Sequence, residues 1–285
     1  MLYFLRALRL FVVKPNVPNS SKLTDTHHLR TSSYRDPARL NARIALHERF
    51  STNPHPWHAW VFDQIEIPPR AQILEVGCGP GGFWQKNHQR IPAHADIILT
   101  DLSHGMLSAA RTKLGTSQFK YACADAQSLP LSAASFDLII ANHMLYHLPG
   151  RQRAYRQFQR LLKPGGKLYA STNGVKHLHE LVDLIQGFDP NIDYQGLNLG
   201  FNLGNGQREL QPWFADVELH LYPDSLEITA AQPLSDYITS MSFFTPETFS
   251  PDRIARLTAH LQSIIDQRGS IHITKSVGLF IAHKS

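Results

Sequence analysis

The chain has 285 residues, of which 42% are hydrophobic and 18% are charged, and its formal net charge is +5. This is an ordinary globular composition, in a chain long enough to bury a large core. The mild charge argues against a nucleic-acid binder. The longest basic pattern, Arg35, Arg39 and Arg43, is either a solvated helix face, which we favour, or a phosphate-binding stripe.

The first 35 residues are predicted to form a flexible N-terminal arm. Residues 1–13 are apolar but too few to span a bilayer, so they form either a simple extension, which we favour, or a weak peripheral membrane contact. Residues 14–35 are rich in polar residues and proline. The two cysteines, Cys78 and Cys123, are expected to be free thiols, which favours a cytoplasmic location.

Residues 36–69 are predicted to form a helical cap. Pro37 suits the first turn of a helix, and Leu40 and Ile44 have helical spacing. After the prolines at 54 and 56, a second helix is expected over 57–65.

Strand and helix patterns alternate over residues 70–174, which we predict to be the ligand-binding core. The expected strands are 73–76, 97–100, 119–122, 136–141 and 167–171, and the expected helices are 83–89, one beginning after Ser103, and 152–162. This alternation predicts a parallel sheet with right-handed crossovers.

Residues 175–285 are predicted to complete the sheet and to carry substrate-lid insertions. The expected helices are 175–185, 207–214, one near Pro233, and 253–265, and the expected strands are 217–222 and 277–282. Glycines and asparagines over 196–206 suit a hinged lid. The predicted fold is therefore α/β: a Rossmann-like, seven-stranded, mostly parallel sheet with helices on both faces, an N-terminal helical cap and lid insertions.

The glycines at 77, 79 and 82 follow the first predicted strand in the pattern GxGxxG. Alone, this pattern fits a dinucleotide or S-adenosylmethionine (SAM) equally well. Glu75 discriminates, because a carboxylate there repels a pyrophosphate but attracts a methionyl ammonium. Asp101 ends the second strand and can accept hydrogen bonds from ribose hydroxyls, while Asp125 follows the third strand and can accept one from the adenine amine. The set favours SAM over NAD.

The segments LEVGCGPG, TDLS, ADAQSLPL, SFDLIIANHMLYHL and LLKPGGKL resemble successive motifs of class I SAM-dependent methyltransferases. The resemblance covers residues 71–173 and is closest to the branch of ubiquinone and menaquinone C-methyltransferases and many small-molecule enzymes. It implies SAM as cofactor, S-adenosylhomocysteine (SAH) as product and a small-molecule acceptor. The cofactor-binding residues it implies are Glu75, Gly77, Cys78 and Gly79 on the methionine side, Asp101 at the ribose, Leu102, Met106, Asp125 and Ala126 around adenine, and Asn142 beside the methionine.

The candidates for catalysis follow the fourth predicted strand, because ligands of open α/β sheets bind at the carboxyl ends of strands. His147 is the first choice for a general base or acceptor-orienting group, followed by Tyr146 and His143, with His177 and His179 as further candidates. No metal-ligand spacing is present, so no metal site is expected. Aromatic residues offered for the acceptor pocket are Trp57, Trp60, Tyr194, Phe201, Trp213, Tyr237, Phe243 and Phe244.

Three alternatives to a small-molecule methyltransferase stay open. An RNA or protein methyltransferase is disfavoured because no basic appended domain is recognisable. A non-catalytic SAM-binding protein would keep the same cofactor motifs. A NAD-dependent oxidoreductase conflicts with Glu75 and Asp125. The sequence leaves the acceptor atom and the oligomeric state open.

Overall fold

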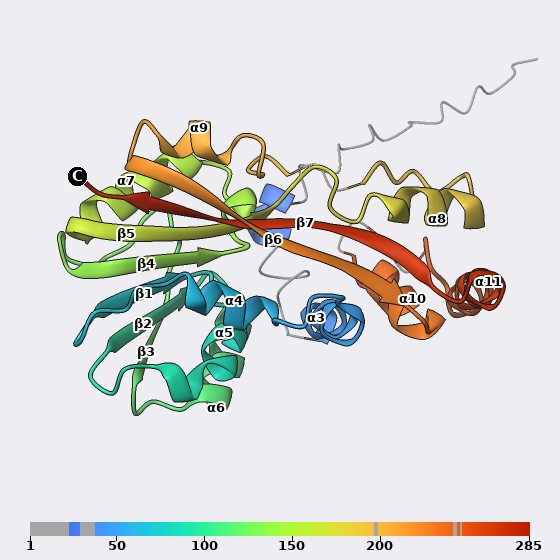
Figure 1. Ribbon diagram of the computed structural model, residues 1–285, viewed down its shortest axis with the longest axis horizontal. Coiled ribbons are helices and arrows are strands. Elements are labelled where there is room, and N and C mark those ends of the chain that lie inside the picture. The colour runs from blue at the N-terminus through green and yellow to red at the C-terminus, as the bar shows by residue number, and fades with distance from the viewer. Residues whose placement is uncertain (1–22, 29–37, 197–198, 242–243, 246) are drawn as a thin grey trace, which may run out of the picture.

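The computed structural model describes residues 23–28, 38–196, 199–241, 244–245 and 247–285 (Figure 1). Its centre is a seven-stranded sheet with the strand order β3-β2-β1-β4-β5-β7-β6. Strands β1 to β5 are parallel, whereas β7 lies antiparallel between β5 and β6. The predicted Rossmann-like, mostly parallel seven-stranded sheet is confirmed.

The parallel strands form the buried centre of the sheet because helices cover both of their faces. They are β1 (Gln72–Val76), β2 (Asp96–Asp101), β3 (Phe119–Cys123), β4 (Phe136–Asn142) and β5 (Leu162–Asn173). Along β4, Leu138 and Ile140 belong to one hydrophobic cluster, while Ile139 and Ala141 belong to the cluster on the opposite face. A nearly continuous apolar strand is what this double coverage requires.

The covering helices begin and end at local signals in the sequence. They are α4 (Trp57–Asp63), α5 (Gly82–Lys86), η2 (His88–Arg90), α6 (His104–Leu114), η3 (Leu145–His147), α7 (Arg151–Leu161) and α9 (Gly206–Leu210). The Ser103 hydroxyl accepts a hydrogen bond from the Met106 amide at 3.3 Å and caps α6, as predicted. We call strands β1 to β5 with α4 to α7 the sheet lobe.

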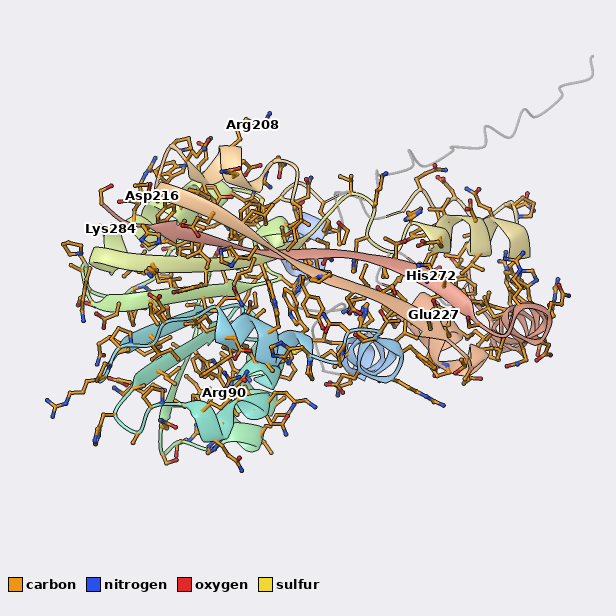
Figure 2. The ribbon with its side chains drawn as sticks, viewed as in Figure 1. Arg90, Arg208, Asp216, Glu227, His272 and Lys284 are labelled. Atoms are coloured by element: carbon orange, nitrogen blue, oxygen red, sulfur yellow. The ribbon has the colours of Figure 1, made fainter. Side chains whose placement is uncertain are left out.

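A second lobe is built on the far ends of two long antiparallel strands, β6 (Ala215–Ile228) and β7 (Ile271–His283). In Figure 1 these strands run across the whole molecule. In Figure 2, Asp216 and Lys284 mark their ends on the sheet lobe, and Glu227 and His272 mark the opposite ends. Helices pack around those opposite ends: α3 (Ala38–Phe50), α8 (Glu180–Phe188), α10 (Ala231–Ser240) and α11 (Pro251–Arg268). We call this assembly the cover lobe.

Strand β6 is longer than the predicted 217–222 because it continues through Pro223, which pairs with Ser276 of β7. Proline has no N–H to donate and is therefore confined to edge strands, and β6 is the edge of this sheet. Strand β7 likewise begins at Ile271 rather than at the predicted residue 277. The sequence thus missed the outer half of both strands, on which the cover lobe is built.

The helix predicted over 175–185 begins five residues later, at Glu180. The backbone stays beside β7 until then: the Gly174 amide donates to the Ser276 carbonyl at 2.8 Å, and the Leu178 amide donates to the Thr274 carbonyl at 2.9 Å. Leu178 has a φ of 56°, which no helix permits. Pairing with β7 therefore overrides the local helical pattern.

Several predictions for the N-terminal region lie outside the described residues. They include the extension or membrane contact of residues 1–13, the start of a helix at Pro37, and the side chains of Arg35 and Arg39. Within the described ranges, no helix combines the length and the apolar character needed to cross a bilayer.

Candidate functional site

A cavity of about 810 Å³ opens at the carboxyl ends of the parallel strands, between the sheet lobe and the cover lobe. The residues proposed above for the cofactor and the three first candidates for catalysis all lie in its wall. They are Glu75, Gly77, Cys78, Gly79, Asp101, Leu102, Met106, Asp125, Ala126, Asn142, His143, Tyr146 and His147. Residues spread over 73 positions of the sequence therefore meet at one site.

The glycine loop after β1 forms the floor of the cavity. Gly77 has a φ of 68° and Gly79 a φ of 54°, which is the left-handed region that glycine adopts without steric cost. A Cβ atom at position 77 would lie 2.8 Å from the Cβ of Met144. The close approach of the loop after β4 therefore also requires glycine at position 77. The bend is thus held tight between two strand ends.

Asp101 ties the end of β2 to this glycine loop. Its Oδ2 accepts a hydrogen bond from the Gly79 amide at 2.9 Å, and its Oδ1 accepts one from the Ser103 amide at 2.8 Å. Burial raises the pKa of this carboxyl, although the backbone donors oppose the shift. A carboxylate has about four acceptor positions, so Asp101 retains capacity for hydroxyl donors from a ligand.

Glu75 is buried at 1% relative exposure behind the glycine loop. The Trp84 indole N–H donates to its Oε2 at 2.7 Å, yet desolvation raises the pKa of the carboxyl to about 8. Trp84 and Asn142 both oppose this shift. Within the described part of the chain, no ion pair joins Glu75 to a basic side chain. A buried carboxyl of this kind suits a ligand that brings its own positive charge.

Asp125 lies in a turn after β3, where its Oδ1 accepts hydrogen bonds from the Gln127 amide at 2.9 Å and from the Gln127 side chain at 3.1 Å. Ala126 beside it is buried at 4% relative exposure. The turn holds the carboxylate at the wall of the cavity, which Leu102 and Met106 of the preceding strand connection also line.

The three catalytic candidates occupy the loop and the η3 turn after β4. His143 has a φ of 49°, and its amide donates to the carbonyl and hydroxyl oxygens of Ser171 at 3.2 and 3.1 Å. Its ring lies 5.3 Å from the Trp57 ring, centre to centre. The Tyr146 and His147 rings meet edge to face at 4.5 Å.

His147 is held in one tautomer by its neighbour. Its Nδ1 lies 2.8 Å from the carbonyl oxygen of Leu23, and because a carbonyl only accepts, Nδ1 carries the proton. In the neutral ring, Nε2 then carries the lone pair. Burial lowers the pKa of His147 to about 4, so the neutral form prevails at neutral pH.

The cover-lobe side of the cavity contains His47, Ser51 and Lys275, which no sequence motif identified. They are joined by Arg43, by His177 and by Tyr237, which was proposed for the acceptor pocket. Arg43 faces this cavity, so its interpretation as part of a solvated helix face is wrong. Of the two further histidine candidates, His177 lines the cavity, whereas His179 is exposed and bonds to the Lys176 carbonyl at 2.9 Å.

The aromatic residues proposed for the acceptor pocket divide in the same way. Trp57 and Tyr237 line the cavity. Five others pack in hydrophobic clusters instead: Trp60, Tyr194, Phe201, Trp213 and Phe244. Phe243 lies outside the described residues. Alternation and helical spacing predict burial but cannot say which buried aromatic borders a cavity.

Comparison with known proteins places the parallel core in a family. The family model described as "Methyltransferase domain" matches residues 74–170. A malonyl-[acyl-carrier protein] O-methyltransferase of Enterobacter lignolyticus is 35% identical over 120 residues, which are 40% of this chain and 45% of that protein. A ubiquinone/menaquinone biosynthesis C-methyltransferase of Idiomarina loihiensis is 28% identical over 116 residues, which are 39% of this chain and 46% of that protein. The match thus spans about half the length of these curated relatives.

Two solved structures share the fold. The YcgJ protein of Bacillus subtilis has a TM-score of 0.55 at 17% identity, covering 80% of this chain and 97% of that one. Phosphoethanolamine N-methyltransferase 2 of Haemonchus contortus, solved with phosphomonomethylethanolamine and SAH, has a TM-score of 0.57 at 20% identity. That similarity covers 92% of this chain and 60% of the other chain.

Proposed function

We propose that this chain, a class I SAM-dependent methyltransferase by its residues 74–170, transfers a methyl group from SAM to a small-molecule acceptor by in-line displacement. The observation that carries the proposal is the convergence of three carboxylates, Glu75, Asp101 and Asp125, with the glycine loop around one cavity. Each carboxylate follows or ends a different parallel strand, so one elongated ligand can meet all three.

The donor groups of the cavity fit SAM. We assign the ammonium of its methionine part to Glu75 and the backbone near Asn142, and the ribose hydroxyls to Asp101. The adenine ring is assigned to Leu102 and Met106, with its exocyclic amine at Asp125 and its edge at Ala126. Gly77, Cys78 and Gly79 border the methionine part. The high pKa of Glu75 supports this assignment because a bound ammonium compensates its buried charge.

When bound, SAM supplies a methyl group on a sulfonium, whose positive charge disappears during transfer. The chain's own contribution is to position the acceptor and exclude water. We assign the general-base role, where the acceptor loses a proton, to His147, whose Nδ1–H is held by Leu23 and whose Nε2 can accept. Tyr146 packs on the His147 ring, and His143 forms the wall beside Trp57.

We propose that residues 36–69 and the segments after residue 175 cover the acceptor. Helix α3 packs against α10, and His47 and Tyr237 from these helices line the cavity. A site closed by two helices favours a small acceptor over an RNA or protein substrate. We also propose a cytoplasmic location, because both cysteines are unpaired in the fold.

Calorimetry with SAH and with NAD tests the cofactor. SAH is expected to bind with one site per chain and to raise the midpoint of thermal unfolding, whereas NAD is expected to do neither. Binding of NAD without SAH would refute the proposal. Methyl transfer from SAM to a panel of small acids, phenols and amines, measured as SAH release, then separates an enzyme from a non-catalytic SAM-binding protein.

A further inference from the structure

The two ends of the cavity differ in charge. The sheet lobe contributes Glu75, Asp101 and Asp125 to the cavity wall, whereas the cover lobe contributes Arg43 and Lys275. The other two carboxylate or cationic side chains of the wall, Glu48 and Lys86, pair with each other at 3.2 Å. We propose that the cover-lobe end binds an oxyanion, a carboxylate or a phosphate monoester, carried by the methyl acceptor, with Lys275 as the anchoring cation. This rests on the function proposed above and specifies its acceptor.

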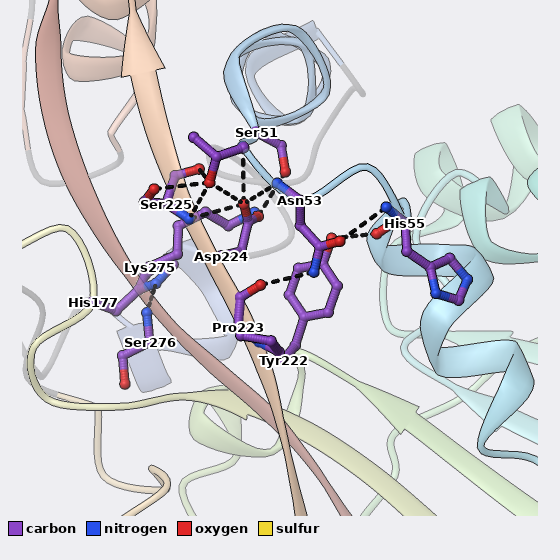
Figure 3. A network of polar contacts seen from close by, with 11 residues as sticks. Ser51, Asn53, His55, His177, Tyr222, Pro223, Asp224, Ser225, Lys275 and Ser276 are labelled. Atoms are coloured by element: carbon purple, nitrogen blue, oxygen red, sulfur yellow. Dashed lines mark hydrogen bonds and ion pairs between the residues drawn. The ribbon is translucent and has the colours of Figure 1, made fainter.

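Lys275 is a buried, ion-paired lysine rather than a mobile surface lysine. Its side chain is 6% exposed, and its ammonium pairs with Asp224, whose side chain is 0% exposed (Figure 3). Asp224 in turn accepts hydrogen bonds from the Ser51 hydroxyl at 2.7 Å and from the Asn53 amide at 3.1 Å. The pair therefore connects the α3–α4 link to both long strands, and it fixes the ammonium in place.

Asp224 cannot serve as the ligand's partner, because its acceptor positions are occupied. Besides Lys275, Ser51 and Asn53, the Thr52 and Ser225 amides donate to its Oδ1 at 3.1 and 2.8 Å. Lys275 is less fully used: an ammonium has three donors, and Asp224 is the only acceptor that the described residues offer it. The lysine borders the cavity, so its remaining donors are available to a ligand.

Next to Lys275, His177 presents a second donor. The Ser276 amide donates to its Nδ1 at 3.2 Å, so Nδ1 holds a lone pair and the neutral ring carries its proton on Nε2 (Figure 3). Burial, together with the nearby positive charges, keeps the pKa of His177 well below its usual value. His177 is therefore a hydrogen-bond donor at this end and not a base.

Buried polar atoms without partners gather at the same cavity. His47 Nδ1 and Asn173 Oδ1 are buried without a hydrogen-bond partner in the described structure, and both residues line the cavity. The His47 ring stacks on the His177 ring with centres 6.0 Å apart. A buried polar atom left unpaired costs roughly 1 to 3 kcal/mol, so native structures keep such atoms where a ligand or water satisfies them.

A cationic or neutral head group fits this end less well than an oxyanion. An ammonium would face Arg43 and Lys275, and the carboxylates on this side, Asp224 and Glu48, are already paired with Lys275 and Lys86. A neutral group could accept a hydrogen bond from the ammonium, but without the charge assistance that an anion supplies. An oxyanion accepts from Lys275 Nζ and from His177 Nε2–H together, and charge-assisted bonds of this kind are about twice as strong as neutral ones.

The test uses the full chain saturated with SAH and calorimetric titration of four probes: butyrate, methyl phosphate, and the uncharged butyramide and trimethyl phosphate. Each anion is expected to bind at least ~10-fold more tightly than its uncharged counterpart. Tighter binding of butyrate would assign a carboxylate acceptor, and tighter binding of methyl phosphate would assign a phosphate. Anions that bind no better than their uncharged counterparts would overturn the proposal.

The key variant is Lys275→Met with Asp224→Asn, which removes the cation without leaving a buried carboxylate unpaired. It is expected to lose the anion preference and to keep its affinity for SAH within about twofold. The matched control, Lys163→Met with Asp137→Asn, removes a Lys–Asp pair of the sheet lobe outside the cavity, with 2.8 Å between Nζ and Oδ2, and should change neither. Retention of the preference in the Lys275 variant would overturn the proposal.

Single variants give the same test should the double variant fail to fold. Lys275→Arg keeps a cation and should keep the anion preference, whereas Lys275→Gln should lose it. His177→Gln retains a side-chain N–H donor near the position of Nε2 and is expected to bind anions better than His177→Leu. Loss of SAH binding by the unmodified chain would refute the proposed function itself, whereas intact SAH binding without anion preference would refute this inference alone.

Discussion

The sheet lobe and the cover lobe contribute to the same cavity in different ways. In the sheet lobe, the residues proposed to bind the cofactor follow consecutive strand ends, from Glu75 to Asn142, so a short stretch of sequence contains them all. In the cover lobe, the residues facing the cavity come from four distant places, represented by His47, His177, Tyr237 and Lys275. A cofactor site made by loop geometry can be recognised locally, whereas an acceptor site made by packing cannot.

The lobes also differ in how burial acts on their titratable groups. Burial disfavours charge, so it raises the pKa of Glu75 and Asp101 on one side and lowers the pKa of His47 and His177 on the other. At neutral pH, Glu75, His47 and His177 of the free protein are therefore mostly uncharged. The Lys275–Asp224 pair, in contrast, is buried as a compensated ion pair. The following predictions test this contrast.

The largest expected effect is a loss of stability in mild acid. The pKa is lowered to about 3 for His47 and His143, to about 4 for His58 and His147, and well below 6.5 for His177. The unfolded chain, with histidine pKa values near 6.5, binds more protons below that pH, so stability falls as the pH drops from about 6.5 towards 4. We expect a loss on the order of 1 kcal/mol per histidine for each pH unit.

Denaturant unfolding between pH 7 and 5 measures this slope. His143→Asn removes one of the five groups, and asparagine tolerates the positive φ of that position. It should reduce the slope by about one proton, whereas the exposed-site control His94→Asn should leave it unchanged. An unfolding free energy that is flat over this range would contradict the neutral, buried state of the histidines.

Asp101→Ala tests the cofactor side and should weaken SAH binding by ~100-fold, about 3 kcal/mol, because it removes the hydroxyl acceptor and frees the Gly79 amide. Calorimetry measures this change. Asp96→Ala, at the other end of the same strand, pairs only with exposed Lys120 and should change the affinity less than twofold. Equal effects of the two variants would show that the Asp101 carboxylate stabilises strand β2 and does not contact the ligand.

His147→Ala tests the general base and should lower kcat by ~100-fold with SAH affinity intact, provided the acceptor must lose a proton. His147→Asn is the informative companion, because its side-chain amide can still donate to the Leu23 carbonyl while offering no basic nitrogen. We expect both variants to be slow. Full activity of the asparagine variant would show that His147 acts only through its hydrogen bond to Leu23. Unchanged turnover of the alanine variant would show that His147 has no role in the reaction.

The smallest expected effect concerns Glu75. It lowers stability as the pH rises, whereas the histidines lower stability as the pH falls. The pKa of Glu75 is about 8 in the fold against an ordinary value of 4.5, so the folded state holds an extra proton between these two pH values, and stability falls as the pH rises through this window. SAH binding favours the ionised form, so affinity should rise by up to ~10-fold per pH unit towards pH 8.

Glu75→Gln should abolish both pH slopes and weaken SAH binding at pH 8 by about tenfold or more. Differential scanning fluorimetry and calorimetry between pH 6 and 8 report the two effects. Glu66→Gln, at an exposed carboxyl outside the cavity, is the matched control. A Glu75→Gln variant that keeps the pH dependence of the unmodified chain would show that another group releases the proton.

The sequence by itself determined the sheet, its glycine bend and the carboxylates at its strand ends, because these depend on residues that are close along the chain. A strand ends, glycine permits a positive φ, and the next side chain must face the ligand edge of a parallel sheet. The positions of Glu75, Asp101 and Asp125 at one cavity follow from that local geometry.

Only the tertiary structure decided the cover-lobe side of the cavity, where we propose that the acceptor binds. Because proline usually ends a strand, Pro223 led the sequence analysis to end β6 before its second half. Residues 174–178 bond to β7 where the sequence predicted the start of a helix. Lys275, Asp224 and Ser51 meet because these long antiparallel strands and the end of α3 fold together over more than 170 sequence positions, as the Ser51–Asp224 bond spans 173. Pairing between side chains so far apart cannot be predicted from hydrophobic periodicity, because the alternation of a strand requires only that a residue be polar and does not specify its partner.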